Sequence, residues 1–323
     1  MKKKLGIAFL SLVFIFVVSI CAGIWWAFGP LSVRDQGKQQ FRIAKGDTFS
    51  EIAFNLQSKG FVRTQWSMRF LGLSDQKVGS IQPGTYTLSS SMSPRQILDV
   101  LHQEAQDSWV TLLEGWRSEE MAQEIAAHLH PTFASDEFIA LAKSREGMLF
   151  PDTYLIPKDA TAQSVVSLLS NTFEKRYQKL ADQYGQGKLS KQNTLTLASI
   201  VAHEASTPED MQMVAGVLMN RLNAGIPLQS DVTLQYVKGY SPTLKTWWQE
   251  PKAEDKFIDS PYNTYMHKGL PPAPICNPGA DAIAAVLNPT KSDYIYYLAD
   301  KEGIVHFAKT LEQHNANIEK YLR

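Results

Sequence analysis

A glutamate at the end of an apolar helical pattern is the residue best placed for chemistry. In KQNTLTLASIVAHEA, the residues Leu197, Val201 and Glu204 share one stripe at helical spacing, which predicts a partly buried carboxyl group. Thr207 and Pro208 start a new helix, so Glu204 lies in the last turn of its own. Burial and a helix C-terminus both disfavour the anion, and a raised pKa suits a general acid. The alternative is a glutamate that only caps or pairs with the next segment.

The neighbouring histidine does not indicate a metal site. An HExxH zinc helix needs a second histidine at the third position after Glu204, and that residue is Thr207. His203 lies about a quarter turn from the apolar stripe, so we expect a partly exposed histidine with no role. We expect neither a metal nor a cofactor.

Two later segments combine groups that can bind a sugar. The first, IPLQSDVTLQY, contains amide, hydroxyl and carboxylate groups within residues 226–236. The second, residues 259–279, is a loop stiffened by prolines that contains the sequence YNTY. Amides can hold an N-acetyl group and tyrosines can stack on a pyranose ring, although tyrosines that only pack are the alternative.

The N-terminus predicts a membrane anchor. Residues 5–28 contain no charged side chain and follow a tail, residues 1–4, that carries three lysines. The lysines place that tail in the cytoplasm and the rest of the chain outside. A cleaved signal peptide is the first alternative, but the apolar run continues through Trp25 and Trp26. A lipoprotein is the second, but Ile20 precedes Cys21 where lipid attachment needs a small residue.

Composition limits the class of partner. The 323 residues include 32 basic and 32 acidic side chains, and without the three N-terminal lysines the remainder is slightly acidic. Nucleic acid is therefore not expected as a partner. The two cysteines, Cys21 and Cys276, cannot form an intramolecular disulfide if Cys21 lies in the anchor.

The rest of the chain divides into a linker and two domains of α+β class. Residues 29–40 form the linker, and residues 41–106 follow the order strand, helix, helix, strand, which resembles a LysM-like module. A small αβ spacer is the alternative for this module. Residues 107–323 are expected to form a mixed α/β catalytic domain.

Four long segments together resemble one protein family. They are EGMLFPDTY, LASIVAHEAS, NRLNAGIPLQSDVTLQY and SPYNTYMHKGLPPAPICNPGADAIAAVLNP. On these motifs the chain resembles the MltG/YceG-like endolytic murein transglycosylase family from the anchor to the C-terminus. The resemblance implies a LysM-like domain followed by a catalytic domain.

The resemblance also implies site residues. The family motif has two glutamates separated by one residue, of which the second matches Glu204 and the first is Ala202 here. Val232 and Ala273 are further departures, at positions where the family has proline and glycine. The matching motif positions imply that substrate contacts are made by Gln229, Asp231, Tyr236, Asn263 and Tyr265.

The implied reaction cleaves the β-1,4 bond between N-acetylmuramic acid and N-acetylglucosamine within nascent glycan strands and leaves a 1,6-anhydro end. One acid/base residue, Glu204, suffices for it. The resemblance further implies a single-pass protein of the bacterial inner membrane, with its catalytic domain in the periplasm, that ends strand elongation beside peptidoglycan synthases. A catalytically silent wall-binding scaffold and a hydrolase with the same acid remain as rivals.

Overall fold

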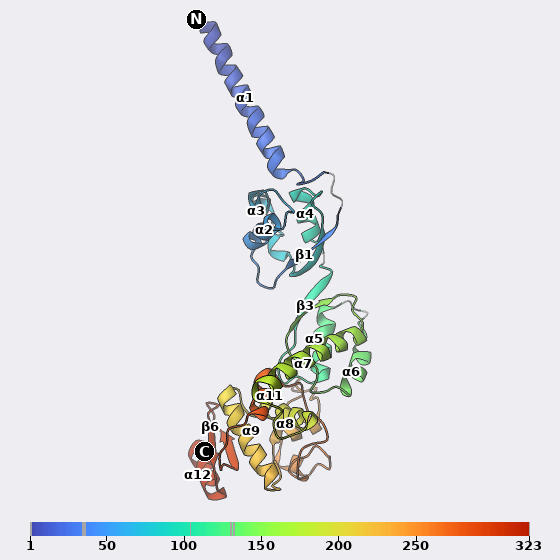
Figure 1. Ribbon diagram of the computed structural model, residues 1–323, viewed down its shortest axis with the longest axis vertical. Coiled ribbons are helices and arrows are strands. Elements are labelled where there is room, and N and C mark those ends of the chain that lie inside the picture. The colour runs from blue at the N-terminus through green and yellow to red at the C-terminus, as the bar shows by residue number, and fades with distance from the viewer. Residues whose placement is uncertain (1, 34–36, 104, 130, 132, 323) are drawn as a thin grey trace. The chain divides into compact units, whose positions relative to one another are not determined.

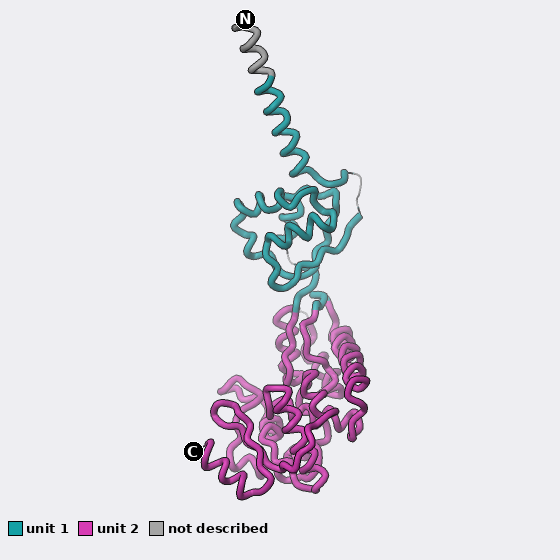
Figure 2. Tube along the Cα trace, turned by 60° about the vertical axis from the view of Figure 1, so that its left-hand side comes forward, with its two compact units in different colours: residues 1–109, 155–159 teal, residues 110–154, 160–323 magenta. Residues whose placement is uncertain are grey.

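The protein forms two compact units. The computed structural model describes residues 2–33, 37–103, 105–129, 131 and 133–322, with side chains from residue 12 onward. One unit comprises residues 1–109 and 155–159 and the other residues 110–154 and 160–323, coloured teal and magenta in Figure 2. The described residues form twelve α-helices and three two-stranded sheets, so the predicted α+β class is confirmed. The domain boundaries at 41–106 and 107–323 and the LysM-like identity stay predictions.

The first helix contains the predicted anchor. It is α1, Lys2–Phe28. Among the described residues, no helix combines the length and the apolar character needed to cross a membrane. Residue 1 and the side chains of residues 2–11, which include the three lysines of the predicted tail, lie outside what is described. The anchor therefore stays a prediction.

The rest of the first unit is a small αβ module. Its elements are β1 (Gln39–Ile43), α2 (Phe49–Ser58), α3 (Gln65–Ser74), the 3-10 turn η1 (Val78–Ser80), β2 (Gly84–Leu88) and α4 (Pro94–Leu101). β1 and β2 pair antiparallel with Phe41 opposite Tyr86, and both side chains are buried. A reciprocal capping box between Thr48 and Glu51 starts α2, as the sequence predicts.

The second unit is mainly helical, and Figure 1 labels most of its helices. Its elements are α5 (Ser118–His128), α6 (Ser135–Lys143), α7 (Ala162–Tyr184), α8 (Lys191–Glu204), α9 (Pro208–Asn223), α10 (Asp231–Lys238), η2 (Ala253–Phe257), α11 (Ala280–Leu287), β5 (Tyr296–Ala299), β6 (Val305–Ala308) and α12 (Leu311–Tyr321). β3 (Asp107–Thr111) and β4 (Thr153–Pro157) form a two-stranded sheet, and each runs through the boundary between the units.

Helix α8 is the centre of the second unit's core. Its residues 194–201 are buried, and α7, α9, α10 and α11 contribute further side chains to the same core. Eight consecutive buried residues make more than two helical turns, so neighbouring elements cover this part of α8 on every side. The end of α8 is therefore held rigidly, which matters because Glu204 is its last residue.

Candidate active site

Glu204 is the last residue of α8 and lies just before the start of α9. The Ser190 side chain caps the start of α8, and the helix ends at Glu204 with Ala205 in an extended conformation. The Thr207 side chain then caps α9, and Pro208 occupies the first turn. The predicted position of Glu204 in the last helical turn is confirmed.

Two hydroxyl groups donate hydrogen bonds to the partly buried carboxyl group of Glu204. The Ser230 hydroxyl donates to Oε1, and the Tyr297 hydroxyl donates a second hydrogen bond. Burial raises the pKa of Glu204 above its ordinary value, and the charge of Asp231 raises it further. The two hydrogen bonds favour the carboxylate and offset part of this rise. The net effect is a raised pKa for a carboxyl group whose conjugate base has two hydrogen-bond donors in place.

A cavity of about 510 Å³ opens beside Glu204. The N-terminal end of α10, strand β5 and helix α12 contribute most of its walls. Its lining comprises Glu204, Arg221, Leu228, Gln229, Asp231, Lys256, Tyr265, Tyr296, Tyr297, Leu298, Ala299, Leu311, His314, Ile318 and Leu322. The cavity combines one acid, carboxylate and amide groups, two cations and three tyrosines, a set that suits a polar ligand with ring faces.

Gln229 is held in a strained backbone conformation at the edge of this cavity. Its φ of 54° lies in the left-handed region, which costs a residue with a side chain about 1–3 kcal/mol. The buried Arg221 guanidinium donates to Gln229 Oε1 at 2.6 Å and to the carbonyl oxygens of Pro227 and Ile295 at 2.7 and 2.9 Å. Arg221 thus joins the segment before α10 to the residue before β5.

Asp231 and Tyr265 meet at the cavity. The Tyr265 hydroxyl donates to Asp231 Oδ1 at 2.6 Å, and the Lys256 ammonium lies 4.8 Å from the centre of the Tyr265 ring. Burial and the Asp231 carboxylate both raise the pKa of Tyr265, so its hydroxyl stays a donor. The structure therefore brings Gln229, Asp231 and Tyr265 together with Glu204.

The structure places the other two predicted contact residues elsewhere. Asn263 is fully buried, and its Nδ2 donates to the carbonyl oxygens of Lys256 and Ile258 at 3.0 and 2.8 Å. Its Oδ1 accepts from the Tyr265 backbone at 2.9 Å. Every polar atom of this side chain is thus used to fold the loop that carries Tyr265. Asn263 shapes the site and is not exposed to a ligand.

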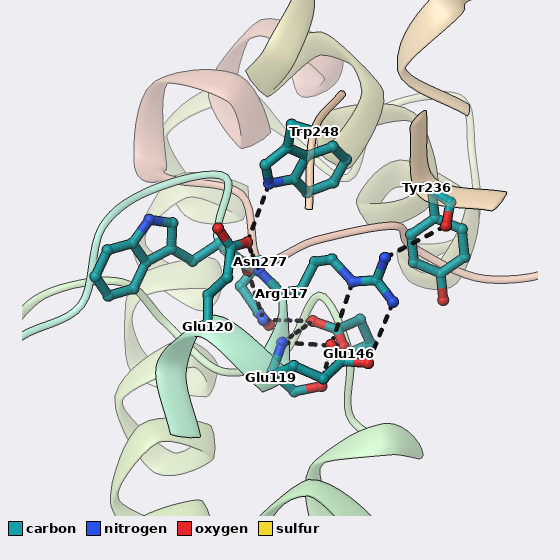
Figure 3. Close-up of polar contacts among 9 residues, drawn as sticks. Arg117, Glu119, Glu120, Glu146, Tyr236, Trp248 and Asn277 are labelled. Carbon is teal, nitrogen blue, oxygen red and sulfur yellow. Dashed lines mark hydrogen bonds and ion pairs between the residues drawn. The ribbon is translucent and has the colours of Figure 1, made fainter. Parts of the chain in front are cut away.

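Tyr236 belongs to a second cluster, which Figure 3 shows. The Arg117 guanidinium lies 4.4 Å from the Tyr236 ring centre and donates to the Tyr236 carbonyl oxygen. In the same cluster Glu146 accepts hydrogen bonds of 2.6 Å from the Ser118 hydroxyl and from Asn277 Nδ2. Burial is the largest cause that raises the pKa of Glu146, to about 7. Sequence reasoning missed Glu146, because a glutamate before a glycine in a loop has no chemical signature.

His203 connects this second cluster to the end of α8. Its Nε2 donates to the Gly115 carbonyl oxygen at 3.0 Å, and its ring lies 3.9 Å from the Trp248 ring, centre to centre. Trp248 in turn donates to Glu120 at 3.0 Å. The ring is partly exposed, as predicted, although Gly115 and Trp248 contact it and burial lowers its pKa. Its contacts position the residue next to Glu204.

Ser230 and Tyr297 are the site residues that sequence reasoning left out. Ser230 stands in the polar segment 226–236 but has no local pattern that pairs it with Glu204. Tyr297 lies in β5, where a tyrosine is an ordinary strand residue. Among the described residues, no group of three or more His, Cys, Asp or Glu side chains lies close enough together to hold a metal ion.

Comparisons with known proteins agree on one family. A family model described as YceG-like matches residues 41–320. An endolytic murein transglycosylase of Streptococcus pneumoniae serotype 2 (strain D39) is 27% identical over 361 residues, covering 98% of this chain but 65% of that protein. The chain thus spans less than two thirds of this relative.

A second relative and a solved structure match over more of their own length. The endolytic murein transglycosylase of Bacillus subtilis (strain 168) is 28% identical over 321 residues, covering 91% of this chain and 87% of that protein. The crystal structure of a YceG-like protein from Listeria monocytogenes superposes with a TM-score of 0.60 at 30% identity, covering 86% of this chain and 98% of that one.

Proposed function

Because the chain belongs to the YceG-like family, we propose that it is an endolytic peptidoglycan lytic transglycosylase with Glu204 as its acid and base. The observation that carries this proposal is the carboxyl group of Glu204, partly buried beside a cavity, with a raised pKa and two hydroxyl donors. The names of the relatives from Streptococcus pneumoniae and Bacillus subtilis support the substrate class.

The proposed reaction has two proton transfers through one residue. Protonated Glu204 donates its proton to the oxygen of the β-1,4 bond between N-acetylmuramic acid and N-acetylglucosamine, and that bond breaks as positive charge develops at C1. The C6 hydroxyl of the muramic acid then attacks C1, and its proton passes to the Glu204 carboxylate. This closes the 1,6-anhydro ring and restores the acid without water.

Ser230 and Tyr297 support the middle of this cycle. Hydrogen bonds to a carboxylate stabilise it more than hydrogen bonds to a neutral acid do. The two hydroxyls therefore stabilise the anion that forms after the first transfer and hold it in place. Burial acts in the opposite direction, because it raises the pKa of Glu204 and so favours the protonated form that the first transfer needs.

The cavity lining supplies groups for the sugar. Gln229 and Asp231 are exposed polar side chains at the cavity, and the rings of Tyr265 and Tyr296 offer faces for a pyranose. We assign these residues to substrate binding. Asn263 acts indirectly, through the loop that carries Tyr265.

Product analysis tests the function. Uncrosslinked glycan strands would be incubated with the full chain, with its Glu204→Gln variant and with Glu209→Gln, which replaces an exposed glutamate at the start of α9. Mass spectrometry should find internal fragments with 1,6-anhydro ends for the full chain and for Glu209→Gln. Loss of a general acid should slow cleavage by about 10²- to 10⁴-fold. Reducing ends would make the protein a hydrolase, and cleavage that survives Glu204→Gln would remove Glu204 from the mechanism.

We further propose that residues 5–28 anchor the protein in the inner membrane, with residues 1–4 in the cytoplasm and the rest in the periplasm. The support is an uncharged apolar run whose side chains are exposed from residue 12 through residue 26. Residues 41–106 serve as a LysM-like module before a catalytic domain of residues 107–323, and the site acts on strands beside their synthases. Resistance to extraction by alkaline carbonate tests the anchor, which a chain released into the supernatant would contradict.

A further inference from the structure

Helix α3 exposes one apolar face. Trp66, Phe70 and Leu73 are 66%, 65% and 87% exposed and share one side of the helix, because they follow one another at spacings of four and three residues. Apolar side chains of this size are normally buried in a soluble domain, and an exposed group of them marks an interaction surface.

A groove of about 610 Å³ with mostly apolar walls lies beside this face. The Phe28 ring at the end of α1 packs edge to face against Phe70, with 5.9 Å between ring centres. Gly72 lets the Phe49 ring lie directly against α3, since a Cβ at residue 72 would overlap that ring. We call the set Phe28, Phe49, Trp66, Phe70 and Leu73 the groove face.

The groove face continues the apolar surface of α1. Trp25 and Trp26, in the last turn of α1, are 73% and 54% exposed. Arg63, which precedes α3, donates to the Trp26 carbonyl oxygen at 2.8 Å and so holds the end of α1 on this module. Residues 12–26 of α1 carry no charge, and their side chains are exposed, so no other described part of the chain covers them. A bilayer is the solvent that suits such a surface.

A cation completes the groove. Arg69 lines it, and its guanidinium lies 5.0 Å from the Trp66 ring centre. Its Nε is buried and finds no hydrogen-bond acceptor among the described residues. A guanidinium group at the edge of an apolar groove matches a phosphate with acyl chains attached. Tryptophan beside arginine is also typical of side chains that lie at the level of lipid head groups.

We propose that the groove face lies in the outer interface of the membrane, where Arg69 binds the phosphate of an anionic phospholipid and the groove takes its acyl chain. This rests on the proposed anchor, because α1 brings the groove face to the bilayer. The module that follows α1 is then seated on the lipid surface, in addition to being tethered to it.

A lipid-quenching experiment on the full chain tests the surface. In a Cys21→Ser background, Leu73→Cys or the exposed control Gln40→Cys would carry an environment-sensitive fluorophore, since Cys276 is buried. The protein would be reconstituted into phosphatidylcholine vesicles with or without phosphatidylglycerol, containing lipids with a nitroxide near the head group. We expect quenching at residue 73 to exceed that at residue 40 by about twofold or more.

The charge is tested in the same system. Arg69→Gln should abolish the additional quenching at residue 73 that phosphatidylglycerol produces, whereas Arg95→Gln, which removes an exposed arginine paired with Asp99, should retain it. Trp66→Ser, at an exposed position, should weaken quenching without unfolding the module.

The outcomes separate the surface from the anchor. A chain that resists carbonate extraction but shows equal quenching at both positions overturns the groove face and leaves the anchor. Selective quenching at residue 73 in a chain that carbonate extracts overturns the anchor alone. A chain that carbonate extracts and that shows no selective quenching overturns both proposals. If residue 73 is shielded from quenching and this shielding disappears when the protein is diluted in lipid, a second copy of the chain occupies the groove. That result would also overturn the proposed lipid ligand.

Discussion

The Ser230 hydroxyl donates a hydrogen bond to Glu204 Oε1, which ties the residue before α10 to the last residue of α8. Serine at this position usually caps its own helix, but here the side chain makes no capping hydrogen bond. Helix α10 thus gives up a local contact, and the carboxyl group gains a donor.

Removing either hydroxyl should move the pH dependence of cleavage upwards. The hydrogen bonds from Ser230 and Tyr297 lower the pKa of Glu204, so Ser230→Ala or Tyr297→Phe raises it further. A reaction that needs the protonated acid then persists to higher pH. The rate should also fall by about 10- to 100-fold, because the carboxylate loses a charge-assisted hydrogen bond. The measurement is kcat/KM against pH. Tyr296→Phe, which changes the neighbouring cavity tyrosine, is the control and should leave the alkaline limb in place.

Asp231→Asn should move the alkaline limb of the pH profile to lower pH. The Asp231 charge raises the pKa of Glu204, and asparagine removes the charge while keeping an oxygen for the Tyr265 hydroxyl. Activity should therefore decline at lower pH than in the unaltered protein. A profile that shifts in the same direction as that of Ser230→Ala would contradict the assignment of Glu204 as the titrating acid.

Asn263→Ala should mainly lower the stability of the fold. The variant leaves two backbone carbonyl oxygens and one N–H without their buried partner, which should lower the free energy of unfolding by about 3 kcal/mol. Urea unfolding measures this, with Asn315→Ala on the exposed side of α12 as a control that should be close to neutral. If Asn263→Ala were as stable as the control and only weakened substrate binding, Asn263 would contact the sugar directly.

Glu146→Gln should flatten the dependence of stability on pH. The folded protein raises the pKa of Glu146 from 4.5 to about 7, so the folded state binds the proton more tightly than the unfolded state does. Stability from this group is complete below pH 4.5 and is lost as pH rises to about 7, by at most about 3 kcal/mol. Glutamine imitates the protonated acid, since its oxygen can accept from Asn277 and its N–H can donate to the Ser118 hydroxyl.

Unfolding midpoints at pH 5 and pH 8 measure this effect. The difference between the two should be clearly smaller in Glu146→Gln than in the unaltered protein. Glu174→Gln, which changes an exposed glutamate on α7, should retain the original difference. Equal differences in all three proteins would show that Glu146 titrates normally.

Short-range signals in the sequence were enough to predict that Glu204 lies in the last turn of its helix and is partly buried. Leu197 and Val201 mark the buried stripe that Glu204 continues, and Thr207 with Pro208 starts the next helix. These signals act within a few residues, since helical periodicity, capping and the missing N–H of proline are local properties. The family motifs added Gln229, Asp231 and Tyr265, which the structure does gather around the cavity.

Only the tertiary structure decided what surrounds that carboxyl group. Ser230 and Tyr297 reach Glu204 because the segment before α10 and strand β5 pack beside the end of α8, and Arg221 joins those two segments. The same packing turns Asn263 inward and places Tyr236 in the Glu146 cluster. Such contacts depend on the paths of loops between distant elements, and no local pattern records which side chain a loop will bring to which helix end.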